Sequence, residues 1–188
     1  IFPSIEYYCK SDFCFPLKAS LNDEVVGIGA LIVHGNTGWL AHIIVHRDHR
    51  NVGIGSSMTK ALIELGHKNL CRTLLLIATA LGEPVYKKFG FEVDTQYVFF
   101  DDGTLSSKNF SAQISILQQH DEQSLFKMDR LVSGEDRKKL LQGHLNNVQV
   151  VFEDNTLKGF YMPTLGDGLI IADSPGAGLA LMKLRMGS

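Results

Sequence analysis

The spacing of apolar positions predicts alternating strands and helices in the first hundred residues. Residues 17–21, 25–34 and 39–45 are apolar runs of strand length, separated by the polar turns Asn22-Asp23-Glu24 and Gly35-Asn36-Thr37-Gly38. A helix is expected next, because apolar side chains recur every three or four residues until a glycine ends the pattern. These side chains are Ile54, Met58, Ala61, Leu62 and Leu65. The three strands are expected to form an antiparallel meander.

A second strand–helix–strand pattern follows the first helix. Residues 74–79 resemble a buried strand, and residues 91–100 alternate apolar and polar positions as a further strand. The segment between them contains Pro84, which suits the first turn of a short helix, and Gly90, which suits its exit. This short helix carries Tyr86 close to the end of the preceding strand.

The junction between residues 39–45 and the first helix has the sequence Arg-x-x-Gly-x-Gly, from Arg50 to Gly55. The first amides of a helix lack intrahelical partners and lie at the positive end of its dipole, so they can bind a diphosphate. Gly53 and Gly55 place no side chain in its path, and Arg50 adds a cation. We therefore interpret the junction as a pyrophosphate cradle, the alternative being an ordinary turn before a capped helix.

Two other glycine-rich phosphate loops are excluded by the residues present. A P-loop needs a lysine where Ser56 stands and a leading glycine where Arg50 stands. A dinucleotide-binding fingerprint needs a third glycine at Met58 and begins directly after its strand, whereas residues 46–50 intervene here.

The order of strand, Arg-x-x-Gly-x-Gly, helix, strand and then Tyr86-x-x-x-Gly-Phe resembles the GNAT superfamily of acetyl-CoA-dependent N-acyltransferases. The resemblance covers residues 25–100. It implies an α/β (α+β) fold with a mixed, largely antiparallel sheet flanked by helices. It also implies direct transfer of an acetyl group from acetyl-CoA, as cosubstrate, to a primary amine.

The resemblance assigns cofactor binding to the strand end and to the loop. A free main-chain N–H near Val45 would polarise the acetyl carbonyl, and the loop amides would bind the diphosphate. The expected cofactor-binding residues are Ile43, Ile44, Val45, Arg50, Asn51, Val52, Gly53, Ile54, Gly55 and Ser56.

Catalytic roles are expected for Tyr86 and His42. Tyr86 corresponds to the family tyrosine that protonates the departing thiolate, the alternative being a core aromatic residue with a solvated hydroxyl. The strand from Trp39 carries no carboxylate, so His42 is the substitute base, unless it is a packed or edge histidine. Glu83 is a second candidate, although a solvated first-turn carboxylate is the simpler explanation. His46 and His49 are assigned to the loop surface, and no metal site is expected.

The sequence from residue 101 onward predicts a linker and a second unit. We expect a GNAT domain at 1–105 with part of its N-terminus missing, a linker at 106–123, and a degenerate, truncated, partial second GNAT-like unit at 124–188. Residues 154–162 align with residues 22–30, turn on turn and strand on strand. Residues 134–145 and 179–184 are expected to be helical, and residues 148–153 and 169–172 to be strands. No arginine precedes Gly176 and Gly178, so we interpret them as a turn and helix cap.

Composition limits the partners. With 18 Lys and Arg against 20 Asp and Glu, the net charge is -2, which does not favour nucleic acid binding. No apolar run reaches the roughly 20 residues that span a bilayer, and three cysteines without metal spacing fit reduced thiols in the cytoplasm. The expected partner is a small-molecule or peptide amine, and a homodimer is compatible with the sequence. The alternative is a non-catalytic acetyl-CoA-binding or protein-interaction module.

Overall fold

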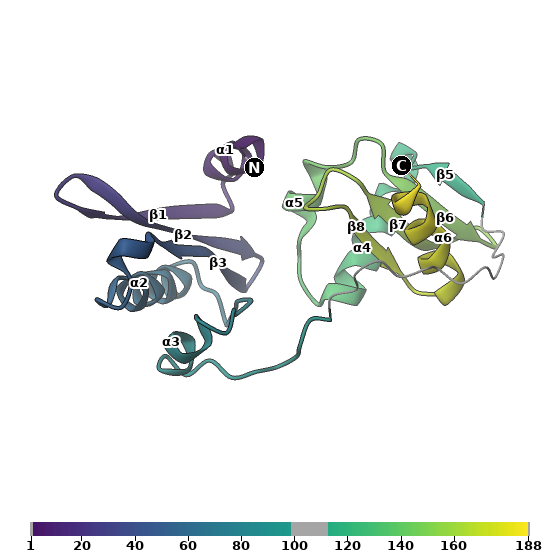
Figure 1. Ribbon diagram of the computed structural model, residues 1–188. Coiled ribbons are helices and arrows are strands. Elements are labelled where there is room, and N and C mark those ends of the chain that lie inside the picture. The colour runs from purple at the N-terminus through teal and green to yellow at the C-terminus, as the bar shows by residue number, and fades with distance from the viewer. Residues whose placement is uncertain (1, 99–112, 188) are drawn as a thin grey trace. The chain divides into compact units, whose positions relative to one another are not determined.

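The computed structural model describes residues 2–98 and 113–187. The chain divides into unit 1, Ile1–Tyr97, and unit 2, Val98–Ser188. Each unit contains a four-stranded sheet with helices packed against it (Figure 1). The predicted fold class, a mixed α+β arrangement built on a mostly antiparallel sheet and followed by a second unit with its own sheet, is confirmed.

Unit 1 is a β-meander with a long helix and a short parallel strand added to it. Its elements are α1 (Phe2–Lys10), β1 (Cys14–Leu21), β2 (Glu24–His34), β3 (Thr37–Val45), η1 (Arg47–His49), α2 (Ile54–Lys68), β4 (Thr73–Leu75) and α3 (Glu83–Lys87). The strand order is β1-β2-β3-β4. The first three strands are antiparallel, and β4 lies parallel to β3.

Helix α2 packs closely on one face of this sheet because β2 presents glycines to it. A Cβ atom at Gly27 would lie 2.8 Å from the sulfur of Met58, and one at Gly29 would lie 3.3 Å from Leu62. Leu31, Leu40 and Leu62 form the buried centre of this layer. Helix α1 lies on the opposite face (Figure 1). The sheet of unit 1 therefore has helices on both faces.

Unit 2 is an antiparallel sheet in the order β5-β6-β7-β8. Its elements are β5 (Ile114–Ile116), η2 (Gln119–Asp121), α4 (Glu122–Ser133), α5 (Lys138–Gln142), β6 (Gln149–Glu153), β7 (Thr156–Met162), β8 (Leu169–Ala172) and α6 (Pro175–Met186). Its core has two parts. One contains Leu125, Leu141 and Phe160, and the other contains Val151 and Leu181.

The β1–β2 and β6–β7 hairpins share one turn geometry. Asn22 and Asp23 have φ of 48° and 67°, and Asp154 and Asn155 have φ of 48° and 57°. Two consecutive positive φ values between paired strands are typical of a type I′ turn, which Asn and Asp tolerate. Both hairpins also have a register shift two residues before the turn. In the first, Ala19 faces Gly27 and Ser20 faces Val25; in the second, Val151 faces Gly159 and Phe152 faces Leu157.

Three predicted elements differ from those observed. The strand expected at 74–79 is only Thr73–Leu75, and residues 91–98 form no strand, while 99 and 100 lie outside the described residues. The helix expected at 134–145 is only Lys138–Gln142, because Gly134, with φ of 72°, is the left-handed C-cap of α4. The strand expected at 169–172 is confirmed.

The predicted domain limits, 1–105, 106–123 and 124–188, remain predictions. Residues 106–112 of the expected linker lie outside the described residues. Residues Ile114–Ile116, also within the expected linker, pair with β6 as strand β5.

Unit 2 contains a buried ion pair. Asp129 on α4 is 1% exposed, and its two carboxylate oxygens accept hydrogen bonds from Arg137 at 3.1 and 2.5 Å. Removing one partner of such a pair leaves the other charge uncompensated. We expect Asp129→Ala to lower the free energy of unfolding by about 3 kcal/mol, measured by urea denaturation. The exposed ion pair of Lys10 and Glu6 supplies the control. Glu6→Ala should change the free energy of unfolding by less than about 1 kcal/mol.

Candidate functional site

Strand β3 has an open edge along its second half. It pairs with β4 only from Thr37 to Trp39, whereas it pairs with β2 as far as Val45. Among the described residues, its last six therefore have a neighbouring strand on one side only. Backbone groups that point to the open side are available to a ligand.

Strand β3 contains a β-bulge opposite β2. Ala41 faces Ala30 and Ile44 faces Ile28, so three steps along β3 match two steps along β2. His42 lies within the bulge and has φ of 54°. A left-handed conformation is costly for a side chain other than glycine, and such residues are concentrated at functional sites. The bulge explains the short β4, since a bulged strand turns away from a straight neighbour.

The bulge also sets the faces on which the predicted residues lie. Ile43 points to the α2 face, where it packs against the cluster around Leu62. His42 lies on the other face, because its ring centroid is 6.4 Å from that of Tyr8 on α1. Ile44 pairs with Ile28, and both side chains are exposed.

Val45 directs its own amide to the open edge. The N–H of His46 donates to the carbonyl of Val26 at 2.8 Å, so His46 is a hydrogen-bonded position of the ladder. Residues alternate along an antiparallel pair, and Val45 consequently turns its N–H and C=O away from β2. Its carbonyl accepts a bond from Nε of Arg50 at 3.0 Å on that side. This bond holds Arg50 beside the strand end.

The loop from Arg50 to Ser56 presents a row of backbone amides. Asn51 and Gly53 have φ of 63° and 91°, which turn the chain into α2. Gly53 is the N-cap of α2 and makes no side-chain cap bond. The first helical bond near this end runs from Ser57 N–H to Gly53 at 3.0 Å. In the part of the chain that the structure describes, the amides of Ile54, Gly55 and Ser56 make no hydrogen bond.

Space above these amides is open. A Cβ atom at Gly53 would have no atom within 4 Å, and one at Gly55 would meet only Val45 at 3.8 Å. Val52 is 72% exposed. The arrangement fits an anion of diphosphate size, because unpartnered amides at the positive end of a fifteen-residue helix lie in reach of solvent.

Tyr86 is half-buried on α3. Its ring lies over Gly82, where a Cβ atom would come within 2.9 Å of Cε2, and packs edge-on against Phe91 at 6.2 Å. Burial raises the pKa of Tyr86 above its ordinary value. The hydroxyl therefore keeps its proton near neutral pH. Helix α3 contacts α2, so Tyr86 belongs to the α2 face of the sheet and His42 to the α1 face.

The other predicted groups are placed less favourably. Glu83 forms an exposed ion pair with Lys87 at 2.6 Å. This pairing does not favour Glu83 as the general base. His46 and His49 lie at the loop surface, 5.8 Å apart between ring centroids. Within residues 2–98 and 113–187, no three His, Cys, Asp or Glu side chains gather as they would around a metal ion. No helix there is long and apolar enough to cross a membrane.

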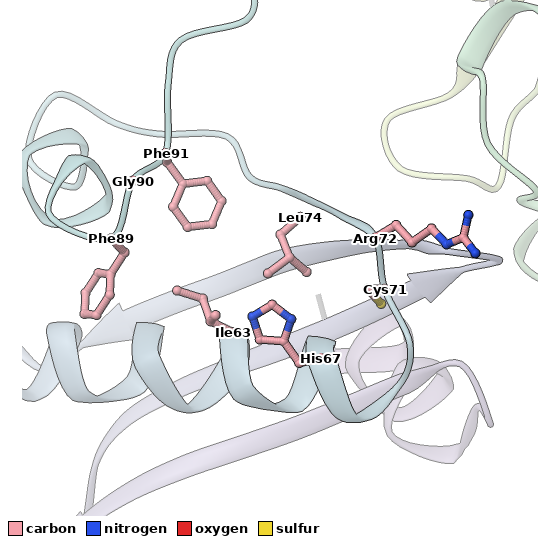
Figure 2. Close-up of a pocket in the computed structure, with 8 residues that line it drawn as sticks. All are labelled: Ile63, His67, Cys71, Arg72, Leu74, Phe89, Gly90 and Phe91. Carbon is pink, nitrogen blue, oxygen red and sulfur yellow. The ribbon is translucent and has the colours of Figure 1, made fainter.

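A pocket of about 300 Å³ lies at the other end of α2 (Figure 2). It is lined by Ile63, His67, Cys71, Arg72, Leu74, Phe89, Gly90 and Phe91. Figure 2 shows the Arg72 guanidinium extending away from the other lining side chains. None of the predicted site residues lines it, and Ile63 is separated from Gly53 by ten positions, about 15 Å of helix. The pocket is therefore distinct from the loop at residues 50–56.

Comparison with known proteins finds a family match within unit 1. Residues 13–93 match the acetyltransferase (GNAT) domain. The matched segment runs from Phe13, just before β1, to a point beyond α3, and it includes the open edge, the loop and Tyr86. The match lies within unit 1 and leaves unit 2 outside it.

Two relatives are similar to the chain. An uncharacterized N-acetyltransferase of Bacillus subtilis, YjcF, is 31% identical over 81 residues, which are 43% of this chain and 58% of that protein. The matched part thus spans less than two thirds of the relative's length. A crystal structure of a candidate acetyltransferase from Pyrococcus horikoshii covers 100% of this chain and 66% of its own, with a TM-score of 0.70 and 22% identity. At that identity the likeness shows the fold alone.

Proposed function

We propose that unit 1 binds acetyl-CoA at the β3–α2 junction and transfers its acetyl group to an amine. The single observation that carries the proposal is the row of unpartnered amides at Ile54, Gly55 and Ser56, beside an arginine anchored to the end of an open strand edge. The match to a GNAT domain supports it. Acetyl-CoA would supply a thioester, whose carbonyl carbon accepts the amine and whose sulfur departs as a thiolate.

Arg50 and the loop amides bind the diphosphate in this mechanism. The Nε–Val45 bond uses one guanidinium donor, and the remaining donors of Arg50 make no hydrogen bond to a described residue, so they are available to phosphate oxygens. Ile43 and Ile44 form the strand end along which the acyl arm would lie. The amide of Val45, turned to the open edge, would stabilise negative charge that develops on the carbonyl oxygen.

His42 and Tyr86 handle the protons from opposite faces. An amine must lose a proton to attack, and His42 on the α1 face accepts it directly or through water. The C–N bond forms, the C–S bond breaks, and Tyr86 on the α2 face donates its proton to the departing sulfur. The open edge of β3 between the two faces is where the acyl group would be held.

His42→Asn tests the base. Asparagine tolerates the left-handed conformation that His42 adopts but cannot act as a general base. We expect kcat/KM for an acceptor amine to fall about tenfold at neutral pH. The measurement is steady-state thiol release with acetyl-CoA. An unchanged kcat/KM would remove His42 from the mechanism.

Unit 2 is proposed to be a second GNAT-like copy without a cofactor site. The shared type I′ turn and register shift support this, as does Gly159, whose contact with Leu181 on α6 parallels that of Gly27 with Met58 on α2. In α6, however, the hydroxyl of Ser174 accepts the N–H of Ala177 at 3.2 Å. Only Asp173 and Ser174 separate β8 from α6, so no loop comparable to residues 46–53 is present.

Calorimetry with coenzyme A followed by thiol release tests the proposal. We expect one molecule bound per chain, binding lost in Arg50→Ala, and acetyl-CoA-dependent thiol release with an amine. Binding without turnover on a broad amine panel would favour a non-catalytic acetyl-CoA-binding module. Absence of binding would contradict both. A homodimer and a cytoplasmic location remain predictions.

A further inference from the structure

The pocket at the C-terminal end of α2 has an apolar end and a polar end. Figure 2 shows Ile63, Phe89 and Phe91 together on one side and Cys71 and Arg72 on the other. The volume of about 300 Å³ lies at the lower end of the range of small-molecule sites, roughly 300–1,000 Å³. Aromatic and branched side chains gathered at one end of such a cavity suit an apolar ring.

Two of the apolar walls are held in place by the surrounding structure. The N–H of Phe91 donates to the carbonyl of Tyr86 at 3.3 Å, and the two rings pack edge-on with centroids 6.2 Å apart. Leu74 is wedged between α2 and β3, because a Cβ atom at Gly66 or Gly38 would lie 2.7 or 2.9 Å from its Cδ2. The apolar end is therefore formed before a ligand arrives, which lowers the entropic cost of binding.

Arg72 sets the charge of the pocket. It is the one permanently charged residue among the described residues that line the pocket, and none of these is acidic. Its side chain is exposed and makes no hydrogen bond or ion pair with a residue in 2–98 or 113–187. Figure 2 shows the guanidinium extending away from the apolar end. An acidic group on a ligand would therefore meet this cation at the rim of the pocket.

The C-terminal end of α2 does not supply an opposite charge of its own. Free carbonyls in the last turn of a helix attract cations. Here the carbonyls of residues 65–67 accept hydrogen bonds from the backbone N–H groups of residues 69–71, at 3.0 or 3.1 Å. These carbonyls are thus already partnered, and the guanidinium at the rim decides which charge the pocket prefers.

We propose that this pocket is a second ligand site, for a carboxylate joined by a short chain to an apolar ring. The ring lies among Ile63, Phe89 and Phe91, and the chain carries the carboxylate to the rim. There the carboxylate accepts two hydrogen bonds from the planar guanidinium of Arg72. The site shares no residue with the loop at 50–56, so neither it nor the proposed acetyl transfer depends on the other.

Three ligands with one ring and chain test the charge preference: 4-phenylbutyrate, 4-phenylbutan-1-ol and 4-phenylbutylamine. In isothermal calorimetry with the whole chain we expect the acid to bind about fivefold more tightly than the alcohol, the value of one exposed ion pair. The amine should bind more weakly than the alcohol. Equal affinities, a preference for the amine, or no saturable binding of the acid would each overturn the inference.

Arg72→Gln tests the residue that is assigned to the carboxylate. The substitution removes the charge from an exposed side chain without a described partner, so the fold should be kept. We expect the Kd of 4-phenylbutyrate to rise about fivefold and that of the alcohol to stay unchanged. Arg47→Gln is the matched control, because the Arg47 side chain is 82% exposed in the same unit and lies outside the pocket. Unchanged binding of the acid in Arg72→Gln, or an equal loss in Arg47→Gln, would contradict the assignment.

The position of the bound acid separates this inference from the proposed function. In ¹H–¹⁵N spectra of the chain, 4-phenylbutyrate should shift the amide signals of residues 63–72 and 89–91 most, and saturating coenzyme A should leave its Kd unchanged. Shifts centred on residues 50–56, or displacement by coenzyme A, would overturn the second site. If coenzyme A does not bind, the proposed function fails, and the amide shifts still decide the inference.

Discussion

Gly55→Glu is expected to weaken coenzyme A binding at least about 100-fold while the protein stays folded. Gly55 lies in the first turn of α2, where only Val45 would meet a new Cβ atom, at 3.8 Å. A carboxylate there would compete for the free amides and repel the diphosphate. Two like charges about 4 Å apart near a protein surface cost roughly 4 kcal/mol, enough for such a loss. Isothermal calorimetry measures the change.

Gly55→Glu should not destabilise the fold. Replacing glycine inside a helix adds up to about 1 kcal/mol of stability, and an acidic side chain in the first turn suits the helix dipole. Gly178→Glu is the matched control, because Gly178 lies in the first turns of α6 and its Cβ would meet only Ala172, at 3.5 Å. It should leave binding unchanged. Equal losses in both variants, or none in Gly55→Glu, would contradict the assignment of the loop.

Tyr86→Phe is expected to lower kcat about 30-fold with little change in KM. The substitution keeps the ring on Gly82 and Phe91 and removes only the proton donor. General acid catalysis contributes about 10² to 10⁴, and a thiolate needs less help than most leaving groups. Steady-state thiol release gives both constants. Tyr97→Phe, on an exposed tyrosine of the same unit, should behave as wild type.

The ratio of kcat in the wild type to kcat in Tyr86→Phe should depend on pH as the direction of the Tyr86 pKa shift requires. Burial raises the pKa of Tyr86 above 10.0, so the acid form persists through neutral and moderately alkaline solution and is lost only above that value. The ratio of wild-type to Tyr86→Phe kcat should therefore stay constant between about pH 6 and pH 9. A ratio that falls to one within this range would show that Tyr86 is not the acid.

Local signals account for the parts of the fold that the sequence predicts. The β2–β3 hairpin, helix α2 and strand β8 are specified by apolar spacing and by turn residues within a few positions, so they appear where expected. The strands predicted at 74–79 and 91–100 would each need a neighbouring strand that is distant in the sequence. The chain turns at Phe91, whose N–H bonds to the Tyr86 carbonyl at 3.3 Å, and residues 91–98 pair with no described strand. Periodicity alone cannot supply such a partner.

The sequence predicts the loop and the strand end of the candidate site, but not the bulge within that strand. Arg50, Gly53 and Gly55 are recognisable because a helix start needs few residues to specify it. The bulge at His42 was missed, although the sequence contains a signal for it. Leu40 and Ile43, which both pack on the α2 side, are three residues apart, whereas regular strand alternation requires two or four. Tyr8 carries no comparable signal, because only tertiary packing brings α1 to His42.

A crystal structure of the chain with coenzyme A tests the central claim most directly. The account predicts diphosphate oxygens within about 3 Å of the amides of Ile54, Gly55 and Ser56, with Arg50 beside them and the sulfur end at the open edge of β3 near Val45. A diphosphate bound elsewhere, for instance at the pocket beside Ile63 and Phe91, would contradict it.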